Sequence, residues 1–320
     1  MNARWVEPDI RDEIVSYTTA MHEKTEIRTK TLLSWIGIRE SKYYDWLERS
    51  GMENRHNGKT PREHWILAWE RQAIIDYAMV HFEEGYRRLT YMMLDDNVVA
   101  VSPSTTYRVL KYAGLLNRWN NGKPNPKKRG FDQPTRPHEQ WHTDIKYVNF
   151  RGTFLFLISV IDGYSRYIVH HELRLSMEEY DVQITVQRAL EKHPTEKPRL
   201  ISDNGSQYIS KDFARFLHEA GLEHTRTSIA HPQANGKIER FHETLSQEFL
   251  RKKSLIDLED ARKQIAEFIE YYNTKRLHSA LFYLTPEDFL EGRVEEKIRL
   301  RENKVRQAQL NRIQAKNVPT

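Results

Sequence analysis

The chain has 320 residues, of which 38% are hydrophobic and 30% are charged, and it contains no cysteine. This length fits two or three domains of ~100–200 residues each, and the lack of cysteine excludes disulfides and cysteine-ligated zinc sites. No apolar run reaches the ~18 residues of a membrane-spanning helix, and the first residues lack the basic-then-apolar pattern of a signal peptide. We therefore expect a cytoplasmic protein without a membrane partner.

The net charge of +5 is unevenly distributed. Residues 1–110 carry 15 Lys and Arg against 17 Asp and Glu, and residues 137–292 carry 20 against 24. By contrast, residues 111–136 carry 7 against 1, and residues 293–320 carry 8 against 3. Positive charge concentrated in one connector and one tail favours a polyanion such as nucleic acid as partner. A solvated basic segment is the alternative interpretation of each block.

Residues 8–120 have mostly helical patterns. The segment 28–50 predicts one helix, a break at Gly37 and a second helix capped by Ser41. The segment 85–115 repeats this layout, with a helix that ends near Leu94, a turn, and a second helix that starts at Ser102-Pro103.

Two short helices joined by a tight connection outline a helix-turn-helix, although helical bundles also contain such pairs. The second pair carries short polar and basic side chains that suit phosphates and base edges. We expect DNA contacts from Arg87, Arg88, Ser104, Thr105, Tyr107, Arg108 and Lys111.

A linker follows, because residues 117–137 ("NRWNNGKPNPKKRGFDQPTRP") are rich in Asn, Gly, Pro and basic residues. Lys127, Lys128 and Arg129 in this linker are candidates for contacts with the DNA backbone. The predicted domains are two helix-turn-helix regions (1–60 and 61–116), the basic linker (117–137), a core domain (138–292) and a basic helical tail (293–320).

From residue 141 the pattern changes to alternating and buried strands separated by helices. The order of elements predicts an α/β domain with a mixed five-stranded sheet and flanking helices. Expected strands lie at 142–150, 152–163, 165–173, 198–203 and 222–227, and expected helices at 177–191, 211–220, 233–253 and 258–273.

Three carboxylates stand out in this domain. Asp144 lies on the first strand, Asp203 in "SDNGSQY" at the end of the fourth, and Glu239 on a later helix. An aspartate before Asn-Gly is, taken alone, usually a turn residue, but a strand, a strand end and a facing helix can bring three carboxylates together. Such a set suits Mg²⁺, and two ions ~3.5–4 Å apart activate a water or a 3′-hydroxyl for attack on a phosphodiester.

The segments "WHTDIKYV", "SDNGSQY" and "HPQANGKIERFHETL" resemble the three catalytic motifs of DDE transposases with a retroviral-integrase-like core. More narrowly, they resemble bacterial transposases of the insertion-sequence-three group. The segment 271–289 is similar to the end of that group's catalytic region, and 85–115 to its upstream helix-turn-helix. The resemblance covers roughly residues 28–290.

This resemblance implies an RNase H-like fold in which Asp144, Asp203 and Glu239 bind two Mg²⁺ or Mn²⁺ ions. It implies cleavage of one strand at the element's end and attack of the freed 3′-hydroxyl on target DNA. Further DNA contacts are expected from Asn204, Gln233, Asn235, Lys237 and Arg240. The implied partners are double-stranded DNA of the terminal repeats and target, and a second copy of the chain in a dimer or higher oligomer.

Two features depart from the family's pattern. Members often carry Lys or Arg seven residues after the catalytic glutamate, where this chain has Ser246. Residues 1–60 contain no heptad run, so a separate upstream-frame partner protein remains open. The alternatives are a catalytically silent repressor or assembly partner, and a metal-dependent nuclease that cuts without joining. The pair Tyr271-Tyr272 is expected to pack in the core, because the basic residues of a tyrosine recombinase are missing.

Overall fold

The computed structural model describes residues 6, 8–52, 66–116, 133–227 and 235–316. The chain divides into two compact units, one of residues 1–65 with 313–320 and one of Ile66–Arg312. Each unit is described by itself. The predicted DNA contacts of Lys127, Lys128, Arg129 and Gln233 lie outside the described residues.

The first unit contains helices α1 (Pro8–Thr25), α2 (Thr29–Ile36) and α3 (Glu40–Glu48). Their apolar faces meet in a core of Val15, Leu33, Ile38, Tyr43 and Trp46. The predicted break at Gly37 is confirmed, since this residue ends α2 in the left-handed conformation at φ 70°, which glycine adopts without strain.

The predicted cap at Ser41 is wrong. Helix α3 begins at Glu40, and its N-cap is Arg39, which has no capping side-chain hydrogen bond. The buried side chain of Ile38 anchors the chain in the core just before this point, so the helix starts before the serine is reached. Glu40 in the first turn instead supplies a negative charge to the positive end of the helix dipole.

A helical region opens the second unit, with α4 (Ala68–Val80), α5 (Tyr86–Asp95) and α6 (Pro103–Tyr112). Leu89, Met93 and Leu110 are buried in its core against Ile74 of α4. The predicted start of the last helix is confirmed. Ser102 caps α6 by accepting a hydrogen bond from the Thr105 amide, and proline occupies the first turn. The helices therefore lie where the sequence predicts them, and their assignment as a helix-turn-helix stays a prediction.

The sheet of the second unit has five strands: β1 (Gln140–Phe150), β2 (Thr153–Asp162), β3 (Ile168–Arg174), β4 (Arg199–Ser202) and β5 (His224–Arg226). They lie in the order β3-β2-β1-β4-β5. The first three strands form an antiparallel meander, while β4 pairs in parallel with both β1 and β5. This is the mixed five-stranded sheet that the sequence predicts.

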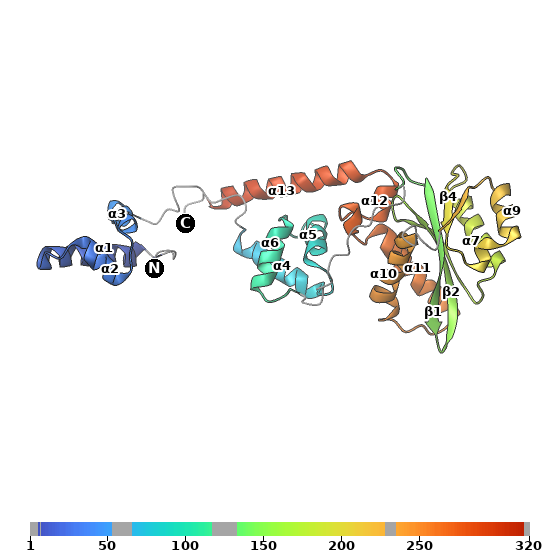
Figure 1. The fold of residues 1–320 in the computed structure, drawn as a ribbon, viewed down its shortest axis with the longest axis horizontal. Coiled ribbons are helices and arrows are strands. Elements are labelled where there is room, and N and C mark those ends of the chain that lie inside the picture. Colours follow the sequence, from blue (N-terminus) through green and yellow to red (C-terminus); the bar gives the residue numbers. More distant parts are fainter. Residues whose placement is uncertain (1–5, 7, 53–65, 117–132, 228–234, 317–320) are drawn as a thin grey trace. The chain divides into compact units, whose positions relative to one another are not determined.

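Helices cover both faces of the sheet (Figure 1). On one face lie α10 (Gly236–Thr244) and α11 (Leu258–Thr274), packed on Leu155 and Leu157 of β2. On the other lie α7 (Glu179–Lys192) and α9 (Lys211–Glu219), packed on Ile158 and Val160 of the same strand, with the short α8 (Ser206–Ile209) beside them. Successive residues of β2 thus serve two apolar cores, as expected for a strand buried on both faces.

The helix predicted over 233–253 is not regular. Its described part begins at Gly236 and passes from α10 into a π-helical segment η2, Leu245–Leu250. Leu245 and Phe249 are buried there, and the Ser246 hydroxyl donates a hydrogen bond to the His242 carbonyl at 2.8 Å. π-helical turns inside α-helices are rare and occur frequently at functional sites.

After the 3₁₀ turn η3 (Ser279–Leu281) and helix α12 (Pro286–Leu290), the chain ends in the long helix α13 (Val294–Lys316). The sequence predicts this tail as a basic helix. Some of its basic side chains form ion pairs with acidic residues of the same unit. Arg301 makes two hydrogen bonds to the Asp95 carboxylate, at 2.8 and 2.5 Å, and Arg312 pairs with the buried Glu70 at 2.8 Å. Helix α13 thus holds the α4–α6 region.

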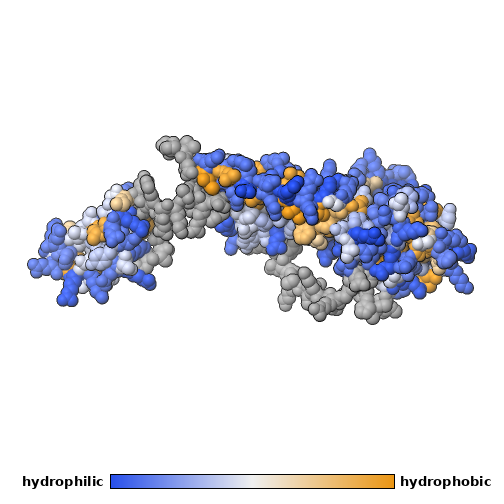
Figure 2. Space-filling model, turned by 90° about the horizontal axis from the view of Figure 1, so that it is seen from above, coloured by the Kyte–Doolittle hydropathy of each residue, from blue (hydrophilic) through white to orange (hydrophobic). Residues whose placement is uncertain are grey.

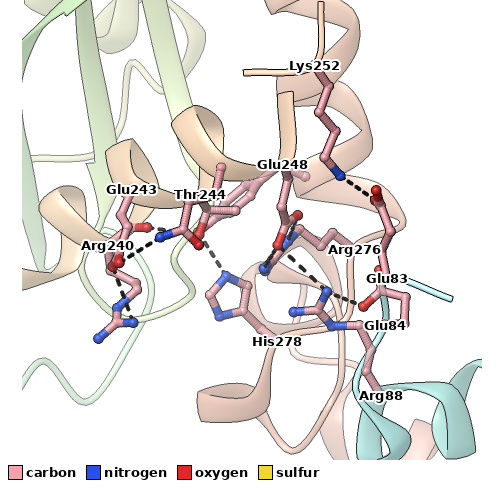
Figure 3. A network of polar contacts seen from close by, with 12 residues as sticks. Glu83, Glu84, Arg88, Arg240, Glu243, Thr244, Glu248, Lys252, Arg276 and His278 are labelled. Carbon is pink, nitrogen blue, oxygen red and sulfur yellow. Dashed lines mark hydrogen bonds and ion pairs between the residues drawn. The ribbon is translucent and has the colours of Figure 1, made fainter. Parts of the chain in front are cut away.

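A second set of ion pairs joins the α4–α6 region to the core (Figure 3). Glu248, in the π-helical segment, accepts two hydrogen bonds from Arg276 at 2.7 and 2.6 Å. Arg88 of α5 pairs with Glu84 at 2.6 Å and lies 3.8 Å from Glu248. The helix that carries Glu239 is therefore linked, through its continuation, to the helical region.

The face of the molecule in Figure 2 is largely hydrophilic, with hydrophobic residues in small separate areas. Among the described residues, none of the helices has the length and apolar character to span a membrane.

Candidate active site

Asp144 lies in the middle of β1, on the face of the sheet that α10 covers. Its side chain is half-buried, and one carboxylate oxygen accepts a hydrogen bond from the Ile145 amide at 2.9 Å. The other lies 3.5 Å from Nδ1 of His242, on α10. Lys146, two residues along the strand, lies on the same face, and burial lowers the pKa of its ammonium group while the Asp144 carboxylate raises it.

Asp203 directly follows β4. Since His142 pairs with Ile201 in the parallel β1–β4 ladder, continuing this register by two residues places Asp144 alongside Asp203. Burial raises the pKa of the Asp203 carboxyl, and the neighbouring Asp144 charge raises it further, while a hydrogen bond from the Gly205 amide lowers it. The two strands therefore bring two of the predicted carboxylates within electrostatic reach.

Asp203 also stabilises the turn that follows it, as an aspartate before Asn-Gly commonly does. Its carboxylate accepts a hydrogen bond from the Gly205 amide at 2.9 Å. A Cβ at Gly205 would lie 2.6 Å from the Gln207 side chain and 3.1 Å from the Asp203 carboxylate. Glycine avoids this crowding of the carboxylate, which the Gly205 amide holds in place.

Glu239 is exposed in the first turn of α10. His242 lies three residues further on the same helix and contacts Asp144, and residues three apart share a helix face. Glu239 is therefore on the side of α10 that borders Asp144. The sequence analysis did not identify His242 and Lys146. The only signal for them was that His242 lies three residues after Glu239 and that Lys146 lies two residues after Asp144.

A metal ion fits the donors at part of this site. Carboxylate oxygens are the ligands that Mg²⁺ prefers, and the Asp144 charge raises the pKa of the Asp203 carboxyl, an effect that a divalent cation would oppose. Within the ranges that the structure describes, no three His, Asp or Glu side chains are gathered closely enough to hold a metal. The structure thus brings together Asp144 and Asp203, whereas Glu239 is exposed on the neighbouring side of α10.

The predicted DNA-binding residues of α5 and α6 differ in their surroundings. Tyr107, Arg108 and Lys111 are exposed on α6, whereas Thr105 is buried. Ser104 is exposed and its hydroxyl lies 2.9 Å from that of Ser102, the capping residue. On α5, Arg87 donates to the Tyr86 hydroxyl and Arg88 is engaged in ion pairs.

Predicted contact residues near the catalytic motifs also vary in exposure. The Asn204 amide donates to the Thr227 carbonyl at 2.6 Å. Asn235 is buried, and its side-chain oxygen has no hydrogen-bond partner in the described parts of the chain. Lys237 donates to the Gly163 carbonyl at 2.8 Å, and Arg240 is exposed beside Glu243.

The sequence matches two families described as "Integrase core domain", over residues 134–232 and 220–286. It is 34% identical over 159 residues to a transposase for insertion sequence element IS904 of Lactococcus lactis subsp. lactis, an alignment that covers 48% of this chain and 62% of that protein. It is 31% identical over 166 residues to an uncharacterized protein of insertion element IS136 of Agrobacterium fabrum, covering 49% of this chain and 85% of that protein.

The chain belongs to the integrase core domain family of insertion-sequence transposases. The resemblance that the three motifs indicate is thereby confirmed. Among solved structures, a simian T-cell lymphotropic virus intasome in complex with a PP2A regulatory subunit has a similar chain, with 16% identity, a TM-score of 0.45 and coverage of 68% of this chain and 74% of that chain. The two integrase core matches together cover residues 134–286, from before β1 to the first residue of α12, the part of this transposase-family chain that holds Asp144, Asp203 and Glu239.

Proposed function

We propose that the protein cleaves DNA at the ends of an insertion sequence and transfers the freed 3′-hydroxyl to target DNA. The observation that carries this proposal is the parallel pairing of β1 with β4, whose register sets Asp144 beside Asp203 at the carboxyl end of β4 in an integrase core domain. The half-buried, mutually repelling carboxylates are suited to a cation and not to a packing role.

Asp144, Asp203 and Glu239 would hold two Mg²⁺ or Mn²⁺ ions. When bound, such ions supply positive charge that activates the attacking oxygen and stabilises the leaving oxygen of a phosphodiester. The Asn204-Gly205 turn aims the Asp203 carboxylate through the Gly205 amide. His242 contacts Asp144 from α10 and so couples the helix that carries Glu239 to the strand that carries Asp144.

The α5–α6 pair acts in this proposal as a helix-turn-helix that binds the element's terminal repeats. The exposed side chains of Tyr107, Arg108 and Lys111 lie on one helix, and Ser102 fixes its N-terminus. Helix α13 contacts Glu70 of α4, Asp95 at the end of α5 and the Ala100 carbonyl between α5 and α6, and none of these residues lies on α6. These contacts leave the α6 side chains exposed for base edges and phosphates.

Two ends of one element have to be held together for transfer, so we expect at least a dimer on DNA. Mass measurement of the complex with end DNA checks this point. A monomeric complex under conditions that yield joined product would contradict it.

The test compares the wild-type chain with Asp203→Asn on labelled end DNA in Mg²⁺ or Mn²⁺, with products resolved by size. The matched control is Asp212→Asn, because Asp212 is an exposed aspartate on α9. We expect nicked and joined products from wild type and from the control, and neither from Asp203→Asn.

The other outcomes identify the alternatives. Binding of verified ends without any product, with several divalent ions, would favour a repressor or the need for a partner protein. Nicking without joining would indicate a nuclease. Equal products from Asp203→Asn and wild type would remove Asp203 from the active site.

A further inference from the structure

A turn between β2 and β3 lies against the first turn of the helix that carries Glu239. Residues 163–167 form this turn, and the Lys237 ammonium donates to the Gly163 carbonyl at 2.8 Å. Arg166 takes the left-handed conformation at φ 66°, which is unfavourable for a non-glycine residue. Hydrogen bonds at both ends hold this conformation, since the Arg166 amide donates to the Asp162 carbonyl and the Asp162 amide to the Tyr167 carbonyl.

Two cations meet at this turn. Burial lowers the pKa of Lys237 to about 7, and the positive charge of Arg166 contributes to that shift. Burial also lowers the pKa of the Arg166 guanidinium. In the ranges the structure covers, this guanidinium has no hydrogen bond and no ion pair within 4.0 Å, and Lys237 has only the neutral Gly163 carbonyl.

The nearest carboxylates offset the two cations only in part. Asp162 is fully buried and accepts hydrogen bonds from the His138 amide, the Ser165 amide and the Ser165 hydroxyl. Glu139 accepts from the Thr135 amide and hydroxyl and from the Arg136 amide. Both acids still act on the cations at longer range, since Asp162 raises the pKa of Arg166 and of Lys237 and Glu139 raises that of Lys237. Among the described residues, however, no carboxylate lies within ion-pair distance of either cation.

A partly buried cation without a direct ion-pair partner is costly unless a counter-ion joins it. We propose that Arg166 and Lys237 form an anion site that holds one phosphodiester group of the DNA substrate beside Glu239. This inference rests on the proposed function, and it identifies the part of the DNA that the integrase core grips. A guanidinium donates two parallel hydrogen bonds to phosphate oxygens, and an ammonium acts as a point charge on a third.

The position of the site gives it a role in the reaction. Lys237 precedes Glu239 by two residues, and Arg240, exposed on the next turn, extends the positive surface along α10. A phosphate held here fixes the DNA backbone relative to the catalytic helix. Arg166 and Lys237 also place positive charge at the start of this helix, which has Ser246 further along where related proteins often have a basic residue.

The first arm of the test needs no DNA. Thermal unfolding of the full chain is measured in sulfate and in chloride at matched ionic strength, for wild type, Arg166→Gln and the control Arg215→Gln, an exposed arginine of α9. An anion that binds only the folded state raises the unfolding temperature. We expect sulfate to raise the Tm of wild type and control beyond its general salting effect, and Arg166→Gln to lose this extra shift. In chloride, Arg166→Gln should be at least as stable as wild type, because it removes an unpaired charge.

The second arm measures binding to duplex DNA over a salt series, in EDTA and with Asp203→Asn as the background of all three proteins. We expect Arg166→Gln to weaken binding ~5- to 10-fold and to reduce the salt slope by about 0.9, the value of one phosphate contact. The control should change neither quantity.

The two arms separate the possible results. Loss of both effects in Arg166→Gln supports a DNA phosphodiester at this site. Loss of the sulfate effect with unchanged DNA binding overturns the DNA assignment in favour of a free anion, and a normal sulfate effect in Arg166→Gln overturns the site itself. If wild type binds no DNA at all, the proposed function fails, while the sulfate arm still decides whether the anion site exists.

Discussion

The ion pair between Glu70 and Arg312 should carry much of the attachment of α13 to the α4–α6 region. Glu70 is 2% exposed and Arg312 is 4% exposed. The Arg312 guanidinium bonds both carboxylate oxygens and the Ala100 carbonyl, and Glu70 also accepts from the Leu67 amide. Removing one partner of a buried pair costs ~3–5 kcal/mol, because the other charge is left unpaired.

Arg312→Met is the perturbation that tests this attachment. The Leu67 amide still bonds Glu70 in the variant, so we expect the low end of the range, ~3 kcal/mol. A loss of this size in the opening free energy speeds amide exchange of α13 by roughly 100-fold. Peptides from 294–312 and 68–80 should exchange faster, while peptides from β1 and β2 serve as the internal reference.

A double variant sharpens the test. Replacing both partners with apolar side chains avoids the unpaired charge, so Glu70→Met with Arg312→Met should recover most of the protection that Arg312→Met loses. If Arg312→Met changes the exchange of α13 less than about fivefold, or if the double variant is worse than the single one, the ion pair does not hold the helix as argued.

Four further results are expected. Burial and Asp144 raise the pKa of Asp203, so the folded state loses stability as pH rises through that pKa. In EDTA, Asp203→Asn should therefore unfold at a higher urea concentration than wild type at pH 7, and this difference should be smaller at pH 4. Burial and neighbouring arginines lower the pKa of His278 to about 3, so stability falls as pH drops from about 6.5 toward 3; His278→Gln should lose less stability than wild type over this range, and an equal loss would refute the assignment. Asn273 bonds the amide and carbonyl of Ile168 at 2.9 and 3.1 Å; Asn273→Leu should cost ~2–4 kcal/mol by urea unfolding, since two buried groups lose their partner, and a cost below 1 kcal/mol would contradict this. Neutralising Lys127, Lys128 and Arg129 should flatten the salt dependence of DNA binding, and an unchanged slope would remove the linker from the interface.

Local patterns predicted much of the core. Each of the five strands lies within a few residues of its expected range, because alternation and apolar runs report burial directly. The start of α6 at Ser102-Pro103 is equally local, since one hydroxyl and one proline determine it. The cap at Ser41 failed because the packing of Ile38, and not the serine, sets where the helix begins.

Other features depend on contacts between distant parts of the chain. The proximity of Asp144 and Asp203 follows from the parallel β1–β4 register, which no local pattern encodes. The contact of His242 with Asp144 requires α10 to dock on β1. The basic tail suggested a polyanion, but Arg301 and Arg312 find acidic partners within the protein. Composition reveals the charge of a segment and not which partner neutralises it.

The pairing of Glu70 with Arg312 joins residues that lie 242 positions apart. A ribosome adding ~5–20 residues per second makes the arginine roughly 12–50 s after the glutamate. During that interval the α4–α6 region of a growing chain has no α13 to hold it, and only its contacts with the core, such as the approach of Arg88 to Glu248, can form. The attachment to α13 therefore forms after the core has been made, so a polypeptide that stops before Arg312 would contain Asp144, Asp203 and Glu239 and lack this pairing.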